Sequence, residues 1–421
     1  MTMNRDRKPG GFRDFNLHRD LERGVADAGF TEPRPIQAQT IGAGLDGDDI
    51  LGLAQTGTGK TAAFGLILLD WILRGRRRGV QALVLAPTRE LAAQIGAELD
   101  VLAKHTRIRH ALIYGGVPQV RQISRLQRGP EIVVGCPGRV LDLIEQGHLD
   151  LSGVEGVVLD EADQMFDMGF LPTVRRIMDA LPDQRQTMLF SATMPQEVRH
   201  LADEMLIDPH VVELASRAPA ATIDHGLVMI PERRKRDLLE HLLDRPDCRR
   251  AIVFTRTKRR TRALAEQLNK AGYRAVGLQG NLSQSQRDRA MRGFREQQFD
   301  VLVATDIAAR GIDVSGVSHV INYDVPSTPE QYTHRIGRTG RAELEGVACT
   351  FVTGEDHAWL RATERMIGAP IRRETIAGFE AEPEPAALRP APRRSPGGGA
   401  PRRGGGGGQA PKRWPRGGSP R

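Results

Sequence analysis

The sequence predicts an α/β protein with two doubly wound parallel-sheet domains in tandem and a basic C-terminal tail. Its 421 residues are more than one hydrophobic core usually organises. Short apolar runs alternate with amphipathic stretches, as buried parallel strands alternate with the helices that cover them. Near the C-terminus the composition changes to glycine, proline and arginine, which cannot build a core.

The predicted strands form two series separated by a short polar stretch. The first series comprises DDILGLA, QALVLAPT (81–88), EIVVGCP (131–137), GVVLDEAD (156–163) and QTMLFSAT (186–193). The second comprises RAIVFTRT (250–257), YRAVGLQG (273–280), DVLVATD (300–306) and SHVINYD (318–324). SRAPAATID is short and polar and contains proline, so we expect it to link the domains. The predicted organisation is an N-terminal extension at 1–14, a first domain at 15–215, the linker at 216–224, a second domain at 225–378 and a tail at 379–421.

The net charge of +8 is concentrated in the tail. From Arg389 to Arg421 there are eight arginines, one lysine and no acidic residue, which leaves about −1 for the rest of the chain. A basic segment rich in glycine and proline is expected to remain disordered and to bind phosphate backbones without sequence preference. The alternative is a tail that only keeps the protein soluble.

The remaining composition predicts a soluble, cytoplasmic protein. Cys136, Cys248 and Cys349 are too far apart in sequence to suggest a zinc site, and their odd number argues against a disulfide framework. The N-terminus lacks the apolar segment of a signal peptide. The apolar stretch AAFGLILLDWIL is interrupted by Asp70 and is too short to cross a bilayer, so we expect no membrane partner.

The segment LGLAQTGTGKT is a candidate phosphate-binding loop. It follows an apolar run and precedes a helical pattern, which is the strand–loop–helix setting that such a loop requires. Gly57 and Gly59 have no Cβ, so backbone N–H groups can converge on an anion. Lys60 is placed to reach the β- and γ-phosphates, and Thr61 to complete the shell of a Mg²⁺ ion. Ala54 replaces the first glycine of the usual phosphate-loop pattern GxxxxGK[ST]. The neighbouring sequence must therefore decide between a phosphate cradle and a glycine-rich turn.

An acidic pair supports the phosphate cradle. Asp160 and Glu161 follow the apolar run GVVL, about a hundred residues after the loop. In open α/β sheets, ligands bind at the carboxyl ends of the strands. We expect Asp160 to bind the Mg²⁺ ion of the nucleotide and Glu161 to polarise the attacking water. Together the two motifs predict a site for the phosphates of an NTP.

The letters DEAD (160–163) stand in this acidic segment, and from about Phe15 to Gly378 the chain resembles a DEAD-box RNA helicase of superfamily 2. The resemblance implies two RecA-like domains, ATP with Mg²⁺ as cofactors, and RNA as partner. GFTEPRPIQ resembles the family's Q motif (15–43), in which the glutamine, here Gln37, reads the adenine edge and an upstream aromatic packs on the ring. The nucleotide-binding residues implied for the first domain are Phe15, Arg34, Gln37, Ala54, Gln55, Thr56, Gly57, Thr58, Gly59, Lys60 and Thr61.

Further motifs are similar to the family's RNA-contact and coupling segments. PTREL, GG and PGR belong to the first domain, and three positions belong to the second. The RNA contacts so implied are Pro87, Thr88, Arg89, Gly115, Gly116, Pro137, Gly138, Arg139, Arg256, Gly280 and Thr305. SAT resembles the segment that couples hydrolysis to strand separation, and the implied coupling residues are Asp163, Ser191, Thr193 and His334. Contacts to the RNA backbone imply binding without sequence preference.

Two motifs of the second domain resemble those that complete the family's nucleotide site. TDIAARGID implies nucleotide contacts at Gly311 and Asp313. HRIGRTGR carries three arginines, and the resemblance makes Arg338 and Arg341 arginine fingers. A guanidinium neutralises the charge that develops as the γ-phosphoryl group is transferred. The implied catalytic residues are Lys60, Asp160, Glu161, Arg338 and Arg341, with Thr61 and Asp160 as metal ligands.

Three positions depart from the family pattern. Cys136 stands where threonine is usual before PGR, Arg34 replaces a frequent threonine of the Q motif, and Gln279 stands where many relatives have histidine. None of the three is a metal ligand, the catalytic glutamate or a finger in the resemblance. We therefore expect them to change RNA affinity and to leave turnover intact.

The chain is thus expected to be an RNA-dependent ATPase that locally unwinds short RNA duplexes or remodels ribonucleoprotein. Its short body and basic tail resemble the bacterial RhlE-type subgroup, which implies a ribosomal precursor or an RNA-degradation complex as partner. One alternative is an RNA clamp or annealing factor that uses mainly its tail, although Lys60, Glu161 and Arg338 argue against a pure binder. The other is a DNA helicase on the same fold. The Q motif, the DEAD letters and the lack of a cysteine-rich zinc module argue against it.

Overall fold

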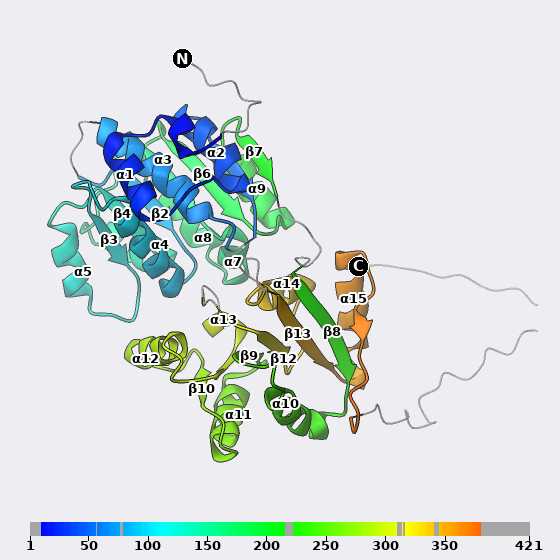
Figure 1. The fold of residues 1–421 in the computed structure, drawn as a ribbon. Helices are drawn as coiled ribbons and strands as arrows, with labels where there is room; N and C mark the ends of the chain where they lie inside the picture. The colour runs from blue at the N-terminus through cyan, green and yellow to red at the C-terminus, as the bar shows by residue number, and fades with distance from the viewer. Residues whose placement is uncertain are drawn as a thin grey trace, which may run out of the picture. The chain divides into compact units, whose positions relative to one another are not determined.

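The computed structural model describes residues 10–55, 57–75, 79–214, 222–309, 314, 316–340 and 345–379. These residues belong to one compact unit of the chain and form two seven-stranded sheets, each with helices on both faces (Figure 1). All paired strands in both sheets are parallel. The predicted fold class of two tandem RecA-like α/β domains is confirmed. Most of the predicted linker and nearly all of the tail lie outside the described residues.

The first domain has the strand order β3-β4-β2-β5-β6-β1-β7. Its strands are β1 (Ile50–Leu53), β2 (Ala82–Leu85), β3 (His110–Ile113), β4 (Ile132–Gly135), β5 (Gly156–Leu159), β6 (Gln186–Ser191) and β7 (His210–Glu213). Its helices are the 3-10 turn η1 (Phe12–Phe15), α1 (Arg19–Asp27), α2 (Pro35–Leu45), α3 (Lys60–Arg74), α4 (Arg89–Leu102), α5 (Gln119–Leu126), α6 (Pro137–Glu145), α7 (Ala162–Asp167), α8 (Leu171–Met178) and α9 (Gln196–Met205).

The second domain has the strand order β10-β11-β9-β12-β13-β8-β14, which is the first order with seven added to every number. The two domains therefore share one topology. Its strands are β8 (Ile223–Met229), β9 (Ala251–Phe254), β10 (Ala275–Leu278), β11 (Val301–Ala304), β12 (His319–Asn322), β13 (Gly346–Val352) and β14 (Arg372–Arg373). Its helices are η2 (Glu232–Arg234), α10 (Lys235–Leu243), α11 (Lys258–Lys270), α12 (Gln284–Arg295), α13 (Asp306–Ala309), α14 (Pro329–Ile336), η3 (Gly354–Asp356) and α15 (His357–Ile367). Across the described segments, no helix combines the length and the apolar character needed to cross a membrane.

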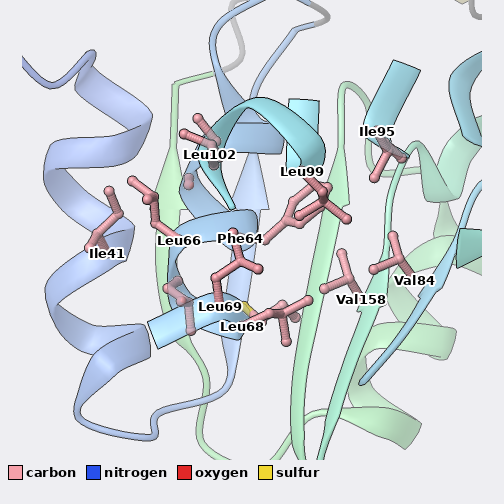
Figure 2. Packing of buried hydrophobic residues seen from close by; sticks show 14 of the residues in the cluster. Ile41, Phe64, Leu66, Leu68, Leu69, Val84, Ile95, Leu99, Leu102 and Val158 are labelled. Atoms are coloured by element: carbon pink, nitrogen blue, oxygen red, sulfur yellow. The ribbon is translucent and has the colours of Figure 1, made fainter. Parts of the chain in front are cut away.

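The first sheet is buried on both faces because its strands contribute to two separate cores. On one face, α2, α3 and α4 cover Val84 and Val158, and Figure 2 shows this core around Phe64. On the other face, Leu83 and Leu85 of the same strand β2 belong to a second core beneath α6, α7, α8 and α9. Successive side chains of a strand point to opposite faces, so a strand that is apolar throughout is buried on both.

A buried carboxylate fixes the start of β1 between its two neighbouring strands. Asp49 Oδ1 accepts a hydrogen bond from Thr187 N, at the second residue of β6, at 2.7 Å. Asp49 Oδ2 accepts one from Ile207 N, ahead of β7, also at 2.7 Å. These charge-assisted bonds satisfy two backbone donors and hold in place the strand that ends at the phosphate loop.

The last described residues pack on α10 of the second domain. Arg234 Nη2 donates to Gly378 O at 2.6 Å, and its guanidinium carbon lies 4.8 Å from the centroid of the Phe379 ring. The His241 ring lies 5.4 Å from the same centroid. These contacts fix the point at which the chain continues into the tail.

Gly24 allows α1 to pack closely on the end of α4. A Cβ at this position would lie 2.1 Å from the Leu102 carbonyl oxygen. Alanine is ordinarily the better helix former by about 1 kcal/mol, but here the backbone of α4 would have to move. We expect Gly24→Ala to lower the free energy of unfolding of the full chain by about 1–3 kcal/mol, measured by chemical denaturation. The control is Gly138→Ala on α6, where nothing lies within 4 Å of the added Cβ, and which should not destabilise. Equal stabilities of Gly24→Ala and the parent would contradict the packing argument.

Candidate active site

The predicted site residues of the first domain collect at one edge of its sheet. The adjacent strands β5, β6 and β1 end at the acidic pair, at Ser191 and at the phosphate loop. The next strands, β2, β4 and β3, end just before Pro87, Pro137 and Gly115. Parallel strands all end at the same edge, so the nucleotide residues and the RNA residues occupy adjoining parts of that edge.

The phosphate loop connects β1 to the first turn of α3. Gly57 (φ 86°) and Gly59 (φ 94°) adopt left-handed backbone conformations that side chains disfavour. Lys60 is buried at the start of α3, and its Nζ donates a hydrogen bond to Ala54 O at 2.8 Å. The helix N-terminus, the loop backbone and an ammonium group are therefore placed to surround a phosphate.

Three other loop residues complete this segment. Thr58 Oγ1 donates to Gln55 O at 2.8 Å and closes the turn of the loop. Thr61 lies beside Lys60 on the first turn of α3. Thr56 lies outside the described residues.

The Q motif is hydrogen-bonded to the phosphate loop. Gln37, buried on α2, accepts from Arg34 N through Oε1 at 2.8 Å and donates from Nε2 to Gly59 O at 3.1 Å. Arg34, a departure from the family pattern, donates from Nη1 to Gly57 O at 2.8 Å. A Cβ at Gly59 would lie 2.6 Å from Gln37 Nε2, so this approach requires glycine. The Gln37 amide keeps a second N–H and a second lone pair for the adenine edge.

Two phenylalanines upstream of the Q motif are buried. Phe12 stacks on Phe30 of the Q motif, with ring centroids 5.9 Å apart and an interplanar angle of 20°. Phe15 is 4% exposed and meets Phe12 edge to face at 6.1 Å. Phe15 was expected to pack on the adenine ring, and this contact stays a prediction. Phe12, which the sequence analysis did not single out, is the upstream aromatic that contacts the Q motif.

The acidic pair is buried at the end of β5. Glu161 has φ 54° and ψ 53°, a left-handed conformation that is uncommon outside glycine, and it precedes the first turn of α7. Such backbone strain is concentrated at functional sites. Glu161 N donates to Asp160 Oδ1 at 3.0 Å. Burial raises the pKa of Asp160 well above its usual value, Lys60 opposes the shift, and the Glu161 charge adds to it.

The chemistry around Asp160 fits a divalent cation. Two neighbouring buried carboxylates need positive charge, and Lys60 supplies only part of it. Asp160 and the Thr61 hydroxyl are oxygen ligands of the kind that Mg²⁺ prefers. Among the described residues, no three His, Cys, Asp or Glu side chains gather into a metal cage.

Asp163 joins the acidic segment to the segment Ser191–Thr193. Its Oδ2 accepts from Thr193 N at 2.9 Å and from Thr193 Oγ1 at 2.8 Å, while its own N donates to Ser191 Oγ at 3.2 Å. His334 Nε2 of the second domain lies 3.6 Å from the same Asp163 Oδ2. The four predicted coupling residues thus gather at Asp163, where Ser191 and Thr193 are joined by hydrogen bonds and His334 of the second domain lies within ion-pair distance.

The arginines of HRIGRTGR have different surroundings. Arg335 is buried, and its Nε and Nη2 donate to the two carboxylate oxygens of Asp306 at 2.5 and 2.7 Å. Its Nη1 donates to Asp324 O at 2.7 Å, and its guanidinium carbon lies 5.0 Å from the Phe254 ring centroid. Arg335 therefore stabilises the second domain itself. It was not among the arginines predicted to be fingers.

Arg338 lines a cavity of about 20 Å³ together with Gln164 and His334. Gln164 directly follows the letters DEAD, and its Oε1 is buried with no hydrogen-bond partner among the described residues. It was not predicted because it belongs to no motif. The predicted residues Arg341, Gly311 and Asp313 lie outside the described part of the chain.

The first-domain RNA residues include one closely packed pair. Thr88 caps α4 by accepting from Leu91 N at 3.2 Å, and Arg89 is the first residue of that helix. Gly116 has φ 76°, and a Cβ there would lie 2.2 Å from Arg89 Nη1. The positive φ favours glycine at this position, and the close approach places the GG segment and Arg89 on one surface.

The PGR segment opens α6 beside them. Pro137 is the first residue of the helix, and Gly138 follows it. Arg139 Nε lies 3.2 Å from Asp142 Oδ2, whereas its Nη1 is buried and has no hydrogen-bond partner in the described part of the chain. Cys136 is buried, and burial raises the pKa of its thiol to about 12. The thiol at this departure from the family pattern is therefore neutral.

The residues of the second domain that were predicted to contact RNA repeat this layout. Gly280, Thr305 and Arg256 follow within two residues the ends of β10, β11 and β9, which are three adjacent strands. In the shared topology these strands correspond to β3, β4 and β2, which precede the RNA residues of the first domain. Arg256 N donates to Asp324 Oδ2 at 2.8 Å, which fixes its backbone.

Two polar contacts join α4 of the first domain to α12 of the second. Arg287 donates from Nε and Nη2 to Glu90 Oε1 at 3.0 and 2.7 Å. Arg89 Nη1 donates to Gln284 Oε1 at 2.6 Å. The members of each pair are almost 200 residues apart, so no local sequence pattern predicts these contacts.

Comparison with known proteins identifies the family. The DEAD/DEAH box helicase family model matches residues 34–201, and the model of the helicase conserved C-terminal domain matches residues 234–343. The DEAD-box ATP-dependent RNA helicase CshA of Bacillus cereus is 49% identical over 375 residues, covering 87% of this chain and 71% of the relative. CshA of Bacillus subtilis is 48% identical over 355 residues, covering 84% of this chain and 72% of the relative. The structure of S. cerevisiae Dbp5 bound to RNA and ADP BeF3 matches with a TM-score of 0.80 at 33% identity, covering 87% of this chain and 96% of that one. This chain therefore belongs to the DEAD/DEAH box helicase family.

Proposed function

We propose that the protein is an ATP-dependent RNA helicase, an RNA-stimulated ATPase that separates short RNA duplexes. The observation that carries this proposal is the shared edge of the first sheet. A phosphate cradle with an acidic pair adjoins a surface built from Arg89, Gly116 and Arg139, and Asp163 connects the pair to the second domain. The names of the CshA relatives and the RNA and ADP BeF3 bound to Dbp5 support the same activity.

ATP binding uses groups that are already positioned. Lys60 is held at the loop by Ala54 O and needs little reorganisation to meet the β- and γ-phosphates. The spare donor and acceptor of Gln37 match the adenine edge, which makes ATP the expected nucleotide. Asp160 and Thr61 would hold the Mg²⁺ ion of the nucleotide. When bound, that ion neutralises phosphate charge.

Hydrolysis requires residues from both domains. Glu161 orients a water against the γ-phosphorus and accepts its proton as the oxygen–phosphorus bond forms. The bond from the γ-phosphorus to the bridging oxygen breaks, which yields ADP and phosphate. Negative charge increases on the transferring oxygens, and Arg338 from the second domain neutralises it. We also assign a finger role to Arg341 and nucleotide contacts to Gly311 and Asp313.

RNA stimulates turnover through differential affinity. The proposed RNA residues lie on both domains, so RNA binds best to the arrangement in which the two sets face one strand. That arrangement also brings Arg338 and His334 to the acidic segment. By linkage, the additional free energy with which RNA binds this arrangement shifts the equilibrium toward the state in which the hydrolytic site is complete.

The cellular setting is a further proposal. The basic tail supports RNA capture, and a ribosomal precursor or an RNA-degradation complex in the cytoplasm is the expected partner. The assignment to the RhlE-type subgroup is supported only by the short body and the basic tail. The relatives in the comparison carry the name CshA.

ATP hydrolysis measured without nucleic acid, with RNA and with DNA tests the proposal. We expect strong stimulation by RNA and little by DNA. Equal stimulation by DNA would favour the DNA-helicase alternative. RNA binding or annealing with no ATP hydrolysis would favour the clamp alternative.

The role of Glu161 predicts the behaviour of Glu161→Gln. The amide keeps the size of the side chain and loses the charge that orients the water. RNA-stimulated turnover should fall at least about a hundredfold, the scale of losing a positioned base, while ATP and RNA still bind. The control is Glu204→Gln, an exposed glutamate paired with Arg175, which should hydrolyse ATP at the parent rate. Near-parental turnover of Glu161→Gln would refute the assigned role.

The separate roles of the arginines predict different outcomes for two alanine variants. Arg338→Ala should lower hydrolysis by roughly three orders of magnitude, as for other arginine fingers, and should leave ATP binding by the first domain unchanged, because the finger belongs to the second. Arg335→Ala removes a buried guanidinium and leaves the partly exposed Asp306 carboxylate without its partner, so it should lower stability by about 3 kcal/mol, the lower end for a broken buried pair. A loss of less than about tenfold in Arg338→Ala would contradict the finger assignment.

The composition of the tail predicts a role in RNA capture only. Truncation after Glu384 removes nine positive charges, so half-maximal ATPase activity should require more RNA, with the saturated rate almost unchanged. The salt dependence of RNA binding should become shallower in the truncated chain. A full-length variant with these nine residues changed to glutamine is the control for length and should behave like the truncation. Equal half-saturation at low and moderate salt would exclude the tail from RNA capture.

A further inference from the structure

Helix α5 carries a row of arginines outside the predicted site. It begins three residues after Gly116, and the segment QVRQISRLQRG contains three arginines and no acidic residue. Arg121, Arg125 and Arg128 have the spacing i, i+4 and i+7, so they lie on one helical face. Arg128 follows the helix, but its N donates to Arg125 O at 3.1 Å and continues the turn. We call these three exposed residues the α5 arginine stripe.

The opposite face of α5 is fixed to the first domain. Gln122 is buried, its Oε1 accepts from Tyr114 N at 3.1 Å, and its Nε2 donates to Tyr114 O at 2.9 Å. Ile123 and Leu126 pack on the second hydrophobic core of the sheet. Tyr114 immediately precedes Gly115, so these bonds tie the helix to the GG segment. Figure 1 shows α5 beside β3 at the edge of the first sheet.

The stripe has no ionic partner within the described part of the chain. No carboxylate lies within ion-pair distance of Arg121, Arg125 or Arg128, whereas Arg175 pairs with Glu204, and Arg176 with Glu145. Like charges at spacing i, i+4 repel and destabilise a helix by about 0.2–0.5 kcal/mol. A stripe that costs stability and meets no acid in its own domain is suited to an anion from outside.

We propose that the α5 arginine stripe is an additional contact surface for the phosphate backbone of RNA that continues past the GG segment. The inference rests on the proposed function, because it extends the RNA surface formed by Arg89 and Gly116. Seven residues of helix span about 10 Å, a length over which a nucleic-acid strand presents several phosphates, which in duplex DNA repeat about every 3.4 Å along the axis. Three guanidinium groups on that length therefore match about three phosphates, each of which an arginine can bind in a two-pronged manner.

The test uses the full chain with Arg121, Arg125 and Arg128 all changed to glutamine. The matched control changes Arg175, Arg176 and Arg199, three exposed arginines of α8 and α9, and removes the same charge. RNA affinity is measured with a non-hydrolysable ATP analogue, between about 50 and 200 mM salt, for a series of RNA lengths. ATPase activity at saturating RNA is measured alongside.

The α5 variant should lose at least about tenfold in affinity for long RNA and little for the shortest RNA that stimulates hydrolysis. Its slope of log affinity against log salt should become shallower by about 2, near 0.7–0.9 for each phosphate contact. Its saturated ATPase rate should equal that of the control.

Identical RNA-length and salt profiles for the α5 variant and the control would overturn the inference. So would an equal loss for short and long RNA, because the stripe would then not extend the path. Failure of the parent protein to respond to RNA at all would instead refute the proposed function, so the two failures can be told apart.

Discussion

The parallel direction of all the strands is the constraint on which the site depends. Within each sheet, every strand begins at one edge and ends at the other. The carboxyl ends of the fourteen strands in the described residues therefore lie along only two edges, one in each sheet. A residue that follows a strand by one or two positions therefore lies next to residues that are distant in sequence. Asp160 and Ser191 become neighbours because β5 and β6 pair in parallel, and Asp49 secures the strand that ends beside them.

Hydrogen bonds between loops then fix the loop residues that the pairing of the strands does not position. Arg34 and Gln37 bind the carbonyl groups of the phosphate loop, and Asp163 binds the segment after β6. Gly59 makes the contact with Gln37 possible, since a methyl group there would overlap the Gln37 amide, and Gly116 allows the same close approach of Arg89. Preorganised polar groups of this kind need little rearrangement when a nucleotide binds, which favours catalysis by electrostatics.

Contiguous motifs were predictable from the sequence, and contacts between distant residues were not. The central strands β1, β2, β4, β5 and β6 have unbroken apolar runs and were predicted. The edge strands β3 and β7 were missed because β3 has only two buried side chains and β7 only one, and Val211 of β7 is exposed. In the second sheet, the interior strands β8 and β13 and the edge strand β14 were also missed. Lys60 and Glu161 could be assigned from local letters and strand position. The bond of Arg335 to Asp306 and the stack of Phe12 on Phe30 depend on how the chain folds back, which no local pattern contains.

The two sheets have the same strand order, so the protein contains the same structural unit twice. In the first unit, the residues after β1 form the phosphate loop. In the second unit, the corresponding strand β8 is followed by IPERRKR, which has no glycine and no phosphate-loop pattern. The three strands that precede the proposed RNA residues have kept their positions in both units. RNA is a polymer of repeating sugar–phosphate units. Two domains of the same topology, with the proposed RNA residues at corresponding strand ends, are suited to bind two successive stretches of such a polymer in the same way.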